Sequence, residues 1–209
     1  MLDNLVLAVI ASIFCLDITA YGQFMISRPV VCGPVIGYLL GDVKTGLWIG
    51  MIVELVWLGV IPMGAAVPQD STTICIFTLI WGIGSIPGNK GAMVLAFVMA
   101  TLAGFLYREI DIWVRYYNIN IMHWVEEGVK KGFEKRICYG TYLGLILFFV
   151  KGVVFFFLLI YPGQWLVSVI YPALPEIVKH GFGFSWKILP LLGFAIIFVN
   201  LHNKNLFLK

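Results

Sequence analysis

One stretch of this chain, residues 22–70, is apolar enough to lie in a membrane yet carries many polar side chains. It reads GQFMISRPVVCGPVIGYLLGDVKTGLWIGMIVELVWLGVIPMGAAVPQD, and its polar residues include Gln23, Arg28, Asp42, Lys44, Glu54, Gln69 and Asp70. Polar groups at membrane depth are costly and usually mark a substrate path. Irregular backbone, which the repeated Gly and Pro predict, is tolerated there only inside protein or beside a cavity. The stretch therefore predicts a polar site within a membrane protein.

The composition of the whole chain supports this interpretation. Of its 209 residues, 61% are hydrophobic and 12% are charged, and the mean hydropathy is +0.96. Soluble domains are about 45–50% apolar and about 25% charged. The chain has too few charges to cover a soluble surface, so we expect an integral membrane protein. Its net charge of +3 does not indicate a nucleic-acid partner.

The apolar runs predict an all-α, multi-span membrane protein that forms a single domain over residues 1–209. About 20 apolar residues cross a bilayer, and we expect about five full spans plus two or three broken or re-entrant helices. The runs expected to cross are residues 4–26, 43–61, 71–87, 91–107 and 137–161. Interrupted helices are expected at residues 30–41 and 162–183, where Gly and Pro recur, and residues 184–201 form a last apolar run. The first residues lack the positive charge of a signal peptide, so we expect the first run to stay in the mature protein.

Residues 108–136 form a different kind of segment, rich in basic and aromatic side chains. They hold six of the fourteen Lys and Arg residues. Such residues accumulate in cytoplasmic loops, and Trp and Tyr favour the membrane interface. We predict one or two surface helices on the cytoplasmic side, with a plain solvated linker as the alternative. The hairpin tip at residues 88–90 would then lie on the outer side.

The polar residues of the 22–70 stretch suit a neutral polyol such as a sugar. Its hydroxyl groups donate and accept hydrogen bonds, which carboxylates and amides can match. The candidate binding residues are Gln23, Arg28, Asp42, Glu54 and Asp70. Glu54 lies in the middle of an apolar run, and the alternative for it is an ion pair with Arg28 or Lys44 that fixes helix packing. Asp42 lies at a predicted helix end, where it could serve only as a cap.

No catalytic or metal-binding set is evident in the sequence. The three histidines lack metal-ligand spacing, and the four cysteines show no paired spacing, so we interpret them as free thiols. Phosphate-binding and dinucleotide-binding motifs do not occur. We expect no cofactor and no metal ion. A membrane aspartyl protease is a further alternative. Such enzymes resemble a pattern with a Gly-x-Gly-Asp segment and a separate Tyr-Asp pair, but here the segment reads Leu39-Leu40-Gly41-Asp42 and no Tyr-Asp pair occurs.

Residues 22–70 closely resemble the membrane C component (enzyme IIC) of mannose-type sugar phosphotransferase systems, the mannose–fructose–sorbose group. The shared markers are Gln23, Ser27-Arg28-Pro29, Gly33-Pro34, the run Gly41-Asp42-Val43-Lys44-Thr45-Gly46, Glu54, and Gly64-Ala65-Ala66-Val67-Pro68 leading to Asp70. Beyond Asp70 the likeness is mainly one of hydropathy.

The resemblance implies a sugar permease subunit in the bacterial cytoplasmic (inner) membrane. It implies an oligomeric complex with a membrane D component, and a cytoplasmic B component that phosphorylates the hexose, so that no catalytic residue is expected on this chain. It further implies that Gln23, Glu54 and Asp70 contact the sugar while Arg28 and Asp42 shape the site.

The chain ends soon after Asn200, whereas members of this group usually continue with more apolar sequence. We therefore keep a second hypothesis, a non-transporting membrane scaffold or sensor of the same family that works through partner contacts at residues 108–136.

Overall fold

The computed structural model describes residues 4–59 and 69–207, and in these ranges the chain is built from seven α-helices with no strand. The helices are α1 (Asn4–Thr19), α2 (Pro29–Leu39), α3 (Val43–Trp57), α4 (Ser71–Ser85), α5 (Lys90–Lys130), α6 (Lys135–Ala173) and α7 (Glu176–Phe207). The prediction of an all-α multi-helix membrane protein is confirmed.

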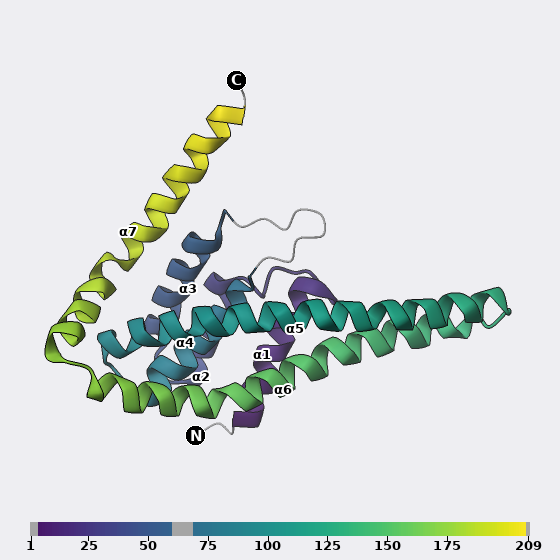
Figure 1. Ribbon diagram of the computed structural model, residues 1–209, viewed down its shortest axis with the longest axis horizontal. Helices are drawn as coiled ribbons and strands as arrows, with labels where there is room; N and C mark the ends of the chain where they lie inside the picture. The colour runs from purple at the N-terminus through teal and green to yellow at the C-terminus, as the bar shows by residue number, and fades with distance from the viewer. Residues whose placement is uncertain (1–3, 60–68, 208–209) are drawn as a thin grey trace.

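The long helices α5 and α6 run antiparallel as a hairpin, and the shorter helices α1 to α4 pack beside one half of it (Figure 1). The other half projects away from the body, and α7 leaves the opposite end at an angle (Figure 1). Helix α4 lies at the centre, in contact with α1, α2, α3, α5 and α6. Twelve of its fifteen residues are buried, so α4 is the helix around which the body is packed.

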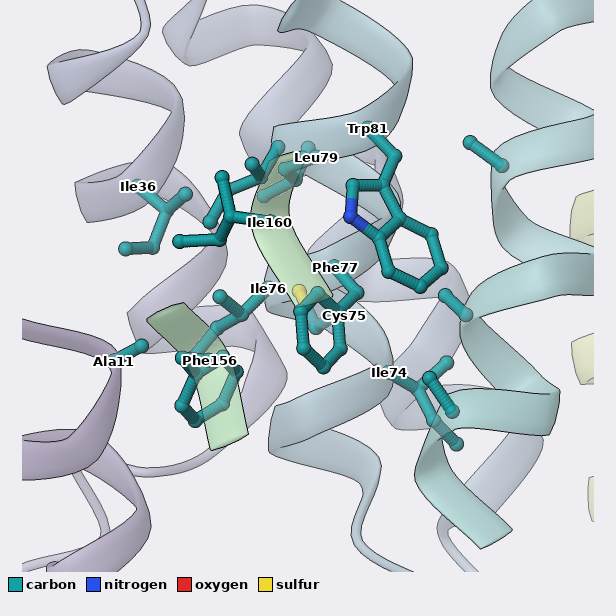
Figure 2. Packing of buried hydrophobic residues seen from close by; sticks show 14 of the residues in the cluster. Ala11, Ile36, Ile74, Cys75, Ile76, Phe77, Leu79, Trp81, Phe156 and Ile160 are labelled. Carbon is teal, nitrogen blue, oxygen red and sulfur yellow. The ribbon is translucent and has the colours of Figure 1, made fainter. Parts of the chain in front are cut away.

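Aromatic side chains fill the core where α4 meets α6. Phe77 stacks on Trp81 with ring centroids 4.6 Å apart and lies 4.9 Å from the ring of Phe156. Figure 2 shows these side chains together with their aliphatic neighbours. The indole N–H of Trp81 donates to the backbone carbonyl of Leu159 at 3.2 Å, so this buried polar group is satisfied. Gly163 of α6 leaves the space that the indole ring occupies.

Helices α2 and α3 form a tight hairpin because glycines face each other across it. A Cβ atom on Gly33 would lie 2.6 Å from the carbonyl oxygen of Gly46, and one on Gly46 would lie 2.5 Å from the carbonyl oxygen of Gly33. Small residues let helix backbones approach closely in membrane proteins. The turn between the two helices passes through Gly41 at φ +85°, a conformation that glycine adopts without steric cost.

The first helix is shorter than the apolar run at residues 4–26 predicts. It ends at Thr19, and the chain then takes left-handed conformations at Gly22, Gln23 and Met25. The interrupted helix expected at residues 30–41 is α2, which ends before Gly41 but contains Pro34 without a break.

The prediction of separate surface helices at residues 108–136 is wrong. Residues 108–130 continue α5 without interruption, a turn follows, and α6 begins at Lys135. No Gly or Pro lies between Gly104 and Gly128 to end the helix. Pairs of opposite charge one turn apart, such as Asp111 with Arg115, support it further.

The interruption expected within residues 162–183 is confirmed, and it is a single break between α6 and α7. Helix α6 runs through Pro162 and Pro172. In membrane helices such prolines are tolerated because neighbouring helices compensate the lost backbone hydrogen bonds. The chain does break at Leu174, whose ψ of 144° is extended, because the following Pro175 disfavours the helical conformation there.

Three described helices, α5, α6 and α7, are long and apolar enough to cross a membrane, while α1, α2 and α4 are shorter apolar helices. The membrane hairpin expected from residues 71–87 and 91–107 corresponds to α4 and the first half of α5, and Asn89 caps the second arm. The number of full spans stays a prediction.

A buried cluster of charges joins α5 to α6 at the point where the hairpin leaves the body. The ammonium nitrogen of Lys151 lies 2.6 Å from one carboxylate oxygen of Asp111, and the two side chains are 6% and 7% exposed. Arg115 donates to the other oxygen at 2.7 Å. Both oxygens of this buried carboxylate are therefore paired, which compensates its removal from water.

We predict that Gly46→Ala destabilises the protein, because the added methyl group would meet the backbone of α2 and force the hairpin apart. The expected loss is about 1–3 kcal/mol in the free energy of unfolding, measured as a lower melting temperature in detergent. Gly181→Ala is the matched control, since a Cβ there meets no neighbouring atom. An unchanged melting temperature for Gly46→Ala would contradict the close packing of α2 on α3.

Candidate functional site

The ends of four helices meet in one region and bring polar side chains from distant parts of the sequence together. The hydroxyl of Thr72 donates to the carbonyl of Ser27 at 2.6 Å, and the thiol of Cys15 lies 3.6 Å from a carboxylate oxygen of Asp70. The residues that we call the polar layer are Asp17, Ser27, Arg28, Glu54, Asp70, Thr72 and Thr73. They come from the C-terminal ends of α1 and α3 and from the N-terminal ends of α2 and α4.

Asp17 holds the loop between α1 and α2 in place. One of its oxygens accepts from the backbone N–H of Phe24 at 2.8 Å, and the other accepts from the N–H and the hydroxyl of Ser27 at 3.2 and 3.0 Å. The side chain is 4% exposed. Because left-handed backbone is unfavourable for Gln23 and Met25, these hydrogen bonds compensate the strain of the loop. Asp17 is thus part of the framework of the site.

Asp70 begins α4 as its N-cap. It accepts from the backbone N–H of Thr72 at 3.0 Å and from the hydroxyl of Thr73 at 2.5 Å. An aspartate at this position satisfies the free N–H groups of the first turn and interacts favourably with the helix dipole. The side chain therefore has a structural role in addition to the sugar contact that the sequence predicts.

Glu54 forms an ion pair with Arg28, one of the two alternatives that the sequence leaves open. The guanidinium of Arg28 donates to Oε1 of Glu54 at 2.8 Å, and the two side chains are 52% and 16% exposed. Lys44, the other candidate partner, lies almost three helical turns away on α3. The second oxygen of Glu54, Oε2, is buried and accepts no hydrogen bond from any residue that the structure describes. A buried acceptor without a partner costs free energy, so this oxygen has unused capacity to accept a hydrogen bond.

Gln23 lies in the loop before α2, exposed to solvent, with its backbone at φ 53°. At the other side of the layer, the amide nitrogen of Gln69 donates to the carbonyl of Thr101 on α5 at 2.7 Å. That bond fixes the residue just before Asp70. The loop that joins α3 to α4 lies mostly outside the described residues, and the marker run at residues 64–68 lies there as well.

Asp42 lies away from the polar layer, at the far end of the α2–α3 hairpin. It is the N-cap of α3 and accepts from the N–H and the hydroxyl of Thr45 at 3.0 and 2.5 Å. The eleven residues of α2 separate it from Arg28 by about 16 Å. The geometry thus favours the capping role for Asp42.

Sequence reasoning missed the hydroxyl groups of the layer, Ser27, Thr72 and Thr73, and the thiol of Cys15. A signal for two of them was present, because an aspartate followed by Thr-Thr at the start of an apolar run is typical of a capped helix. Nothing in the sequence places Cys15 beside Thr73, 3.6 Å away. The four cysteines are free thiols, as expected.

We predict that Arg28→Gln destabilises the protein more than the double variant Arg28→Gln/Glu54→Gln does. Removing the cation alone leaves the mostly buried carboxylate of Glu54 unpaired. Because Arg28 is half exposed, solvent screens the loss, and we expect about 1–2 kcal/mol for the single variant. Free energies of unfolding of the wild type, the two single variants and the double variant give the coupling energy. Arg108→Gln is the control, since its ion pair with Glu109 is exposed, and equal losses in the single and double variants would contradict the pairing.

Comparison with known proteins identifies the family. A family model described as the sorbose-specific IIC component of the PTS system matches residues 1–208. The mannose-specific EIIC component of Escherichia coli (strain K12) is 25% identical over 176 residues, which are 84% of this chain and 65% of that protein. The N-acetylgalactosamine permease IIC component 1 of the same organism is 23% identical over 201 residues, covering 94% of this chain and 72% of the relative.

A higher identity is confined to a shorter region. A putative N-acetylgalactosamine permease IIC component 2 of E. coli (strain K12) is 43% identical over 70 residues, or 34% of this chain and 52% of that protein. The chain thus spans just under two thirds of the length of the mannose-specific relative.

Two solved structures share the fold. One is described only as the structure of a membrane protein, with a TM-score of 0.76 and 23% identity, covering 94% of this chain and 78% of that one. The other is a cryo-electron microscopy structure of the mannose transporter ManYZ with microcin E492, with a TM-score of 0.62 and 22% identity, covering 95% and 77%. The family model spans nearly the whole chain and confirms the resemblance seen in residues 22–70: the protein belongs to the sorbose-specific IIC component family of the sugar phosphotransferase system.

Proposed function

We propose that this chain is the membrane permease subunit of a mannose-type phosphotransferase system, and that it binds a hexose at the polar layer. The observation that carries the proposal is the buried Oε2 atom of Glu54, which accepts no hydrogen bond among the described residues. A sugar hydroxyl supplies the hydrogen-bond donor that this oxygen lacks. Membership of the IIC family supports the same conclusion independently.

The other members of the layer suit the same ligand. Asp70 retains acceptor capacity beyond its capping bonds, because a carboxylate has about four lone-pair sites. The amide of Gln23 can both donate and accept, and the guanidinium of Arg28 offers donors that Glu54 does not use. The ring of Phe24 is 75% exposed and could cover the apolar face of a sugar.

The partners follow from the family. Relatives of this chain are named as IIC components of sugar permeases and sugar-specific systems. We infer that the chain works as a single permease domain within an oligomeric complex with a D component in the bacterial cytoplasmic membrane. A phosphorylated cytoplasmic B component would transfer the phosphoryl group to the sugar. On this proposal the chain itself positions the hexose and carries no catalytic residue.

Isothermal titration calorimetry on the chain co-purified with its D component tests the proposal. We expect saturable binding of a hexose by the wild type and an affinity at least about tenfold lower for Glu54→Gln, because a neutral amide is a weaker acceptor than a carboxylate. Asp70→Asn should weaken binding while keeping α4 capped, since Asn is also a good N-cap. Glu109→Gln, an exposed carboxylate on α5, is the control and should bind normally.

Gln23→Ala keeps the test informative if Glu54→Gln reduces stability, because the Gln23 side chain is exposed. Wild-type affinity in Glu54→Gln, Asp70→Asn and Gln23→Ala alike would remove the polar layer as the sugar site. A stable complex that binds no common hexose would instead favour the scaffold or sensor hypothesis.

A further inference from the structure

A polar cavity lies at the opposite end of α4 from the polar layer. It has a volume of about 750 Å³ and is formed by the α4–α5 turn, the end of α6 and the first turns of α7. Its polar lining consists of Asn89, Tyr171, Glu176, Lys179, His180 and Lys187. The fifteen residues of α4 separate it from Asp70 by about 22 Å. The two sites therefore do not overlap.

The cations of this cavity come from a single face of α7. Lys179, Gly183 and Lys187 recur at intervals of four residues, which places their side chains one above another. Lys179 pairs with Glu176 at 3.0 Å, but the Glu176 side chain is 78% exposed and can move aside. Lys187 is exposed, and Glu176 is the one acidic residue of the lining. The cavity therefore has an excess of positive charge.

Apolar side chains complete the wall. Ile86 lies on the α4–α5 side of the cavity and Phe184 on the α7 side. Three helices that are long and apolar enough to cross a membrane begin or end at this point: α5 starts at Lys90, α6 ends at Ala173 and α7 starts at Glu176. The ends of spanning helices lie near the membrane surface. A ligand here would meet basic groups and apolar surface together.

We propose that this cavity binds a phosphate ester group, such as the headgroup of an anionic phospholipid. A phosphate offers several acceptor oxygens to the two ammonium groups, and lysine binds phosphate as a point charge. The amide of Asn89 adds a neutral donor. Basic pockets between membrane helices at the bilayer surface bind lipid headgroups, and Ile86 and Phe184 provide apolar contact for a glycerol backbone or the start of an acyl chain.

Replacing Gly183, which lines the cavity, can fill it without removing a charge. A Cβ on Gly183 would meet no atom within 4 Å, so Gly183→Leu places a large side chain in open space and stays compatible with the helix. Gly181 is also open but does not line the cavity, so Gly181→Leu is the matched control. Lys179→Gln/Lys187→Gln removes the charges, and Lys131→Gln at the tip of the α5–α6 hairpin serves as its charge control.

Native mass spectrometry of the full chain in detergent would measure binding of dimyristoyl phosphatidylglycerol and, separately, of glycerol 3-phosphate. We expect saturable binding of phosphatidylglycerol, reduced about tenfold or more in both Gly183→Leu and the double lysine variant, and unchanged in Gly181→Leu and Lys131→Gln. The same pattern for glycerol 3-phosphate, without lipid binding, would support the phosphate site and identify a soluble ester as its source. Circular dichroism would establish that each variant is folded.

Equal binding by wild type, Gly183→Leu and the double lysine variant would overturn the proposal, because the ligand would then bind elsewhere. Failure of the folded wild type to bind either compound would overturn it as well.

Discussion

The structure depends on satisfying backbone N–H groups at helix starts and in the loop before α2. Unpaired backbone groups are costly in a membrane protein, and here acidic or amide side chains fill the need. Asp42 caps α3, Asp70 caps α4 and Asn89 caps α5, while Asp17 collects the N–H groups of the loop before α2. The caps fix where α3, α4 and α5 begin, and Asp17 fixes the loop that leads into α2. These residues thereby help to decide which helix ends meet in the polar layer.

This constraint separates the carboxylates of the 22–70 stretch into two kinds. Asp42 is used for capping, Asp70 combines capping with acceptor capacity that remains free, and Glu54 has no backbone partner. Glu54 projects from the interior of α3, where the backbone N–H groups are already bonded within the helix, so its charge is balanced by Arg28 instead. Helix α4 is central and packs on five other helices. Its N-terminal end contributes to the polar layer, and its C-terminal end lies at the cavity beside α7.

The sequence predicted the fold class and the family, because composition and a dense motif constrain both. For Glu54 the sequence left an ion pair as the alternative to sugar contact, and the structure shows that pair with Arg28 and not with Lys44. The sequence could not predict that α6 continues through Pro162 and Pro172, because the compensation comes from tertiary packing such as that of Trp81 on Gly163. Aromatic and basic side chains at residues 108–136 indicated separate surface helices, but no Gly or Pro between Gly104 and Gly128 ends α5. The framework role of Asp17 was not predicted. Its partners, Phe24 and Ser27, belong to a loop in which Gln23 and Met25 take left-handed conformations, and these residue types do not signal such a loop.

The α5–α6 hairpin has a mechanical consequence. From Asp111 to Lys130 the helix extends about 28 Å beyond the buried charge cluster, and beyond that cluster the two helices pack mainly on each other (Figure 1). The ion pairs of Asp111 with Lys151 and Arg115 therefore lie at the base of the projecting part of the hairpin. Given that length, a rotation of the hairpin by about 10° about its base would move the tip by about 5 Å. A small rearrangement among the packed helices would thus displace the tip by about the height of one helical turn.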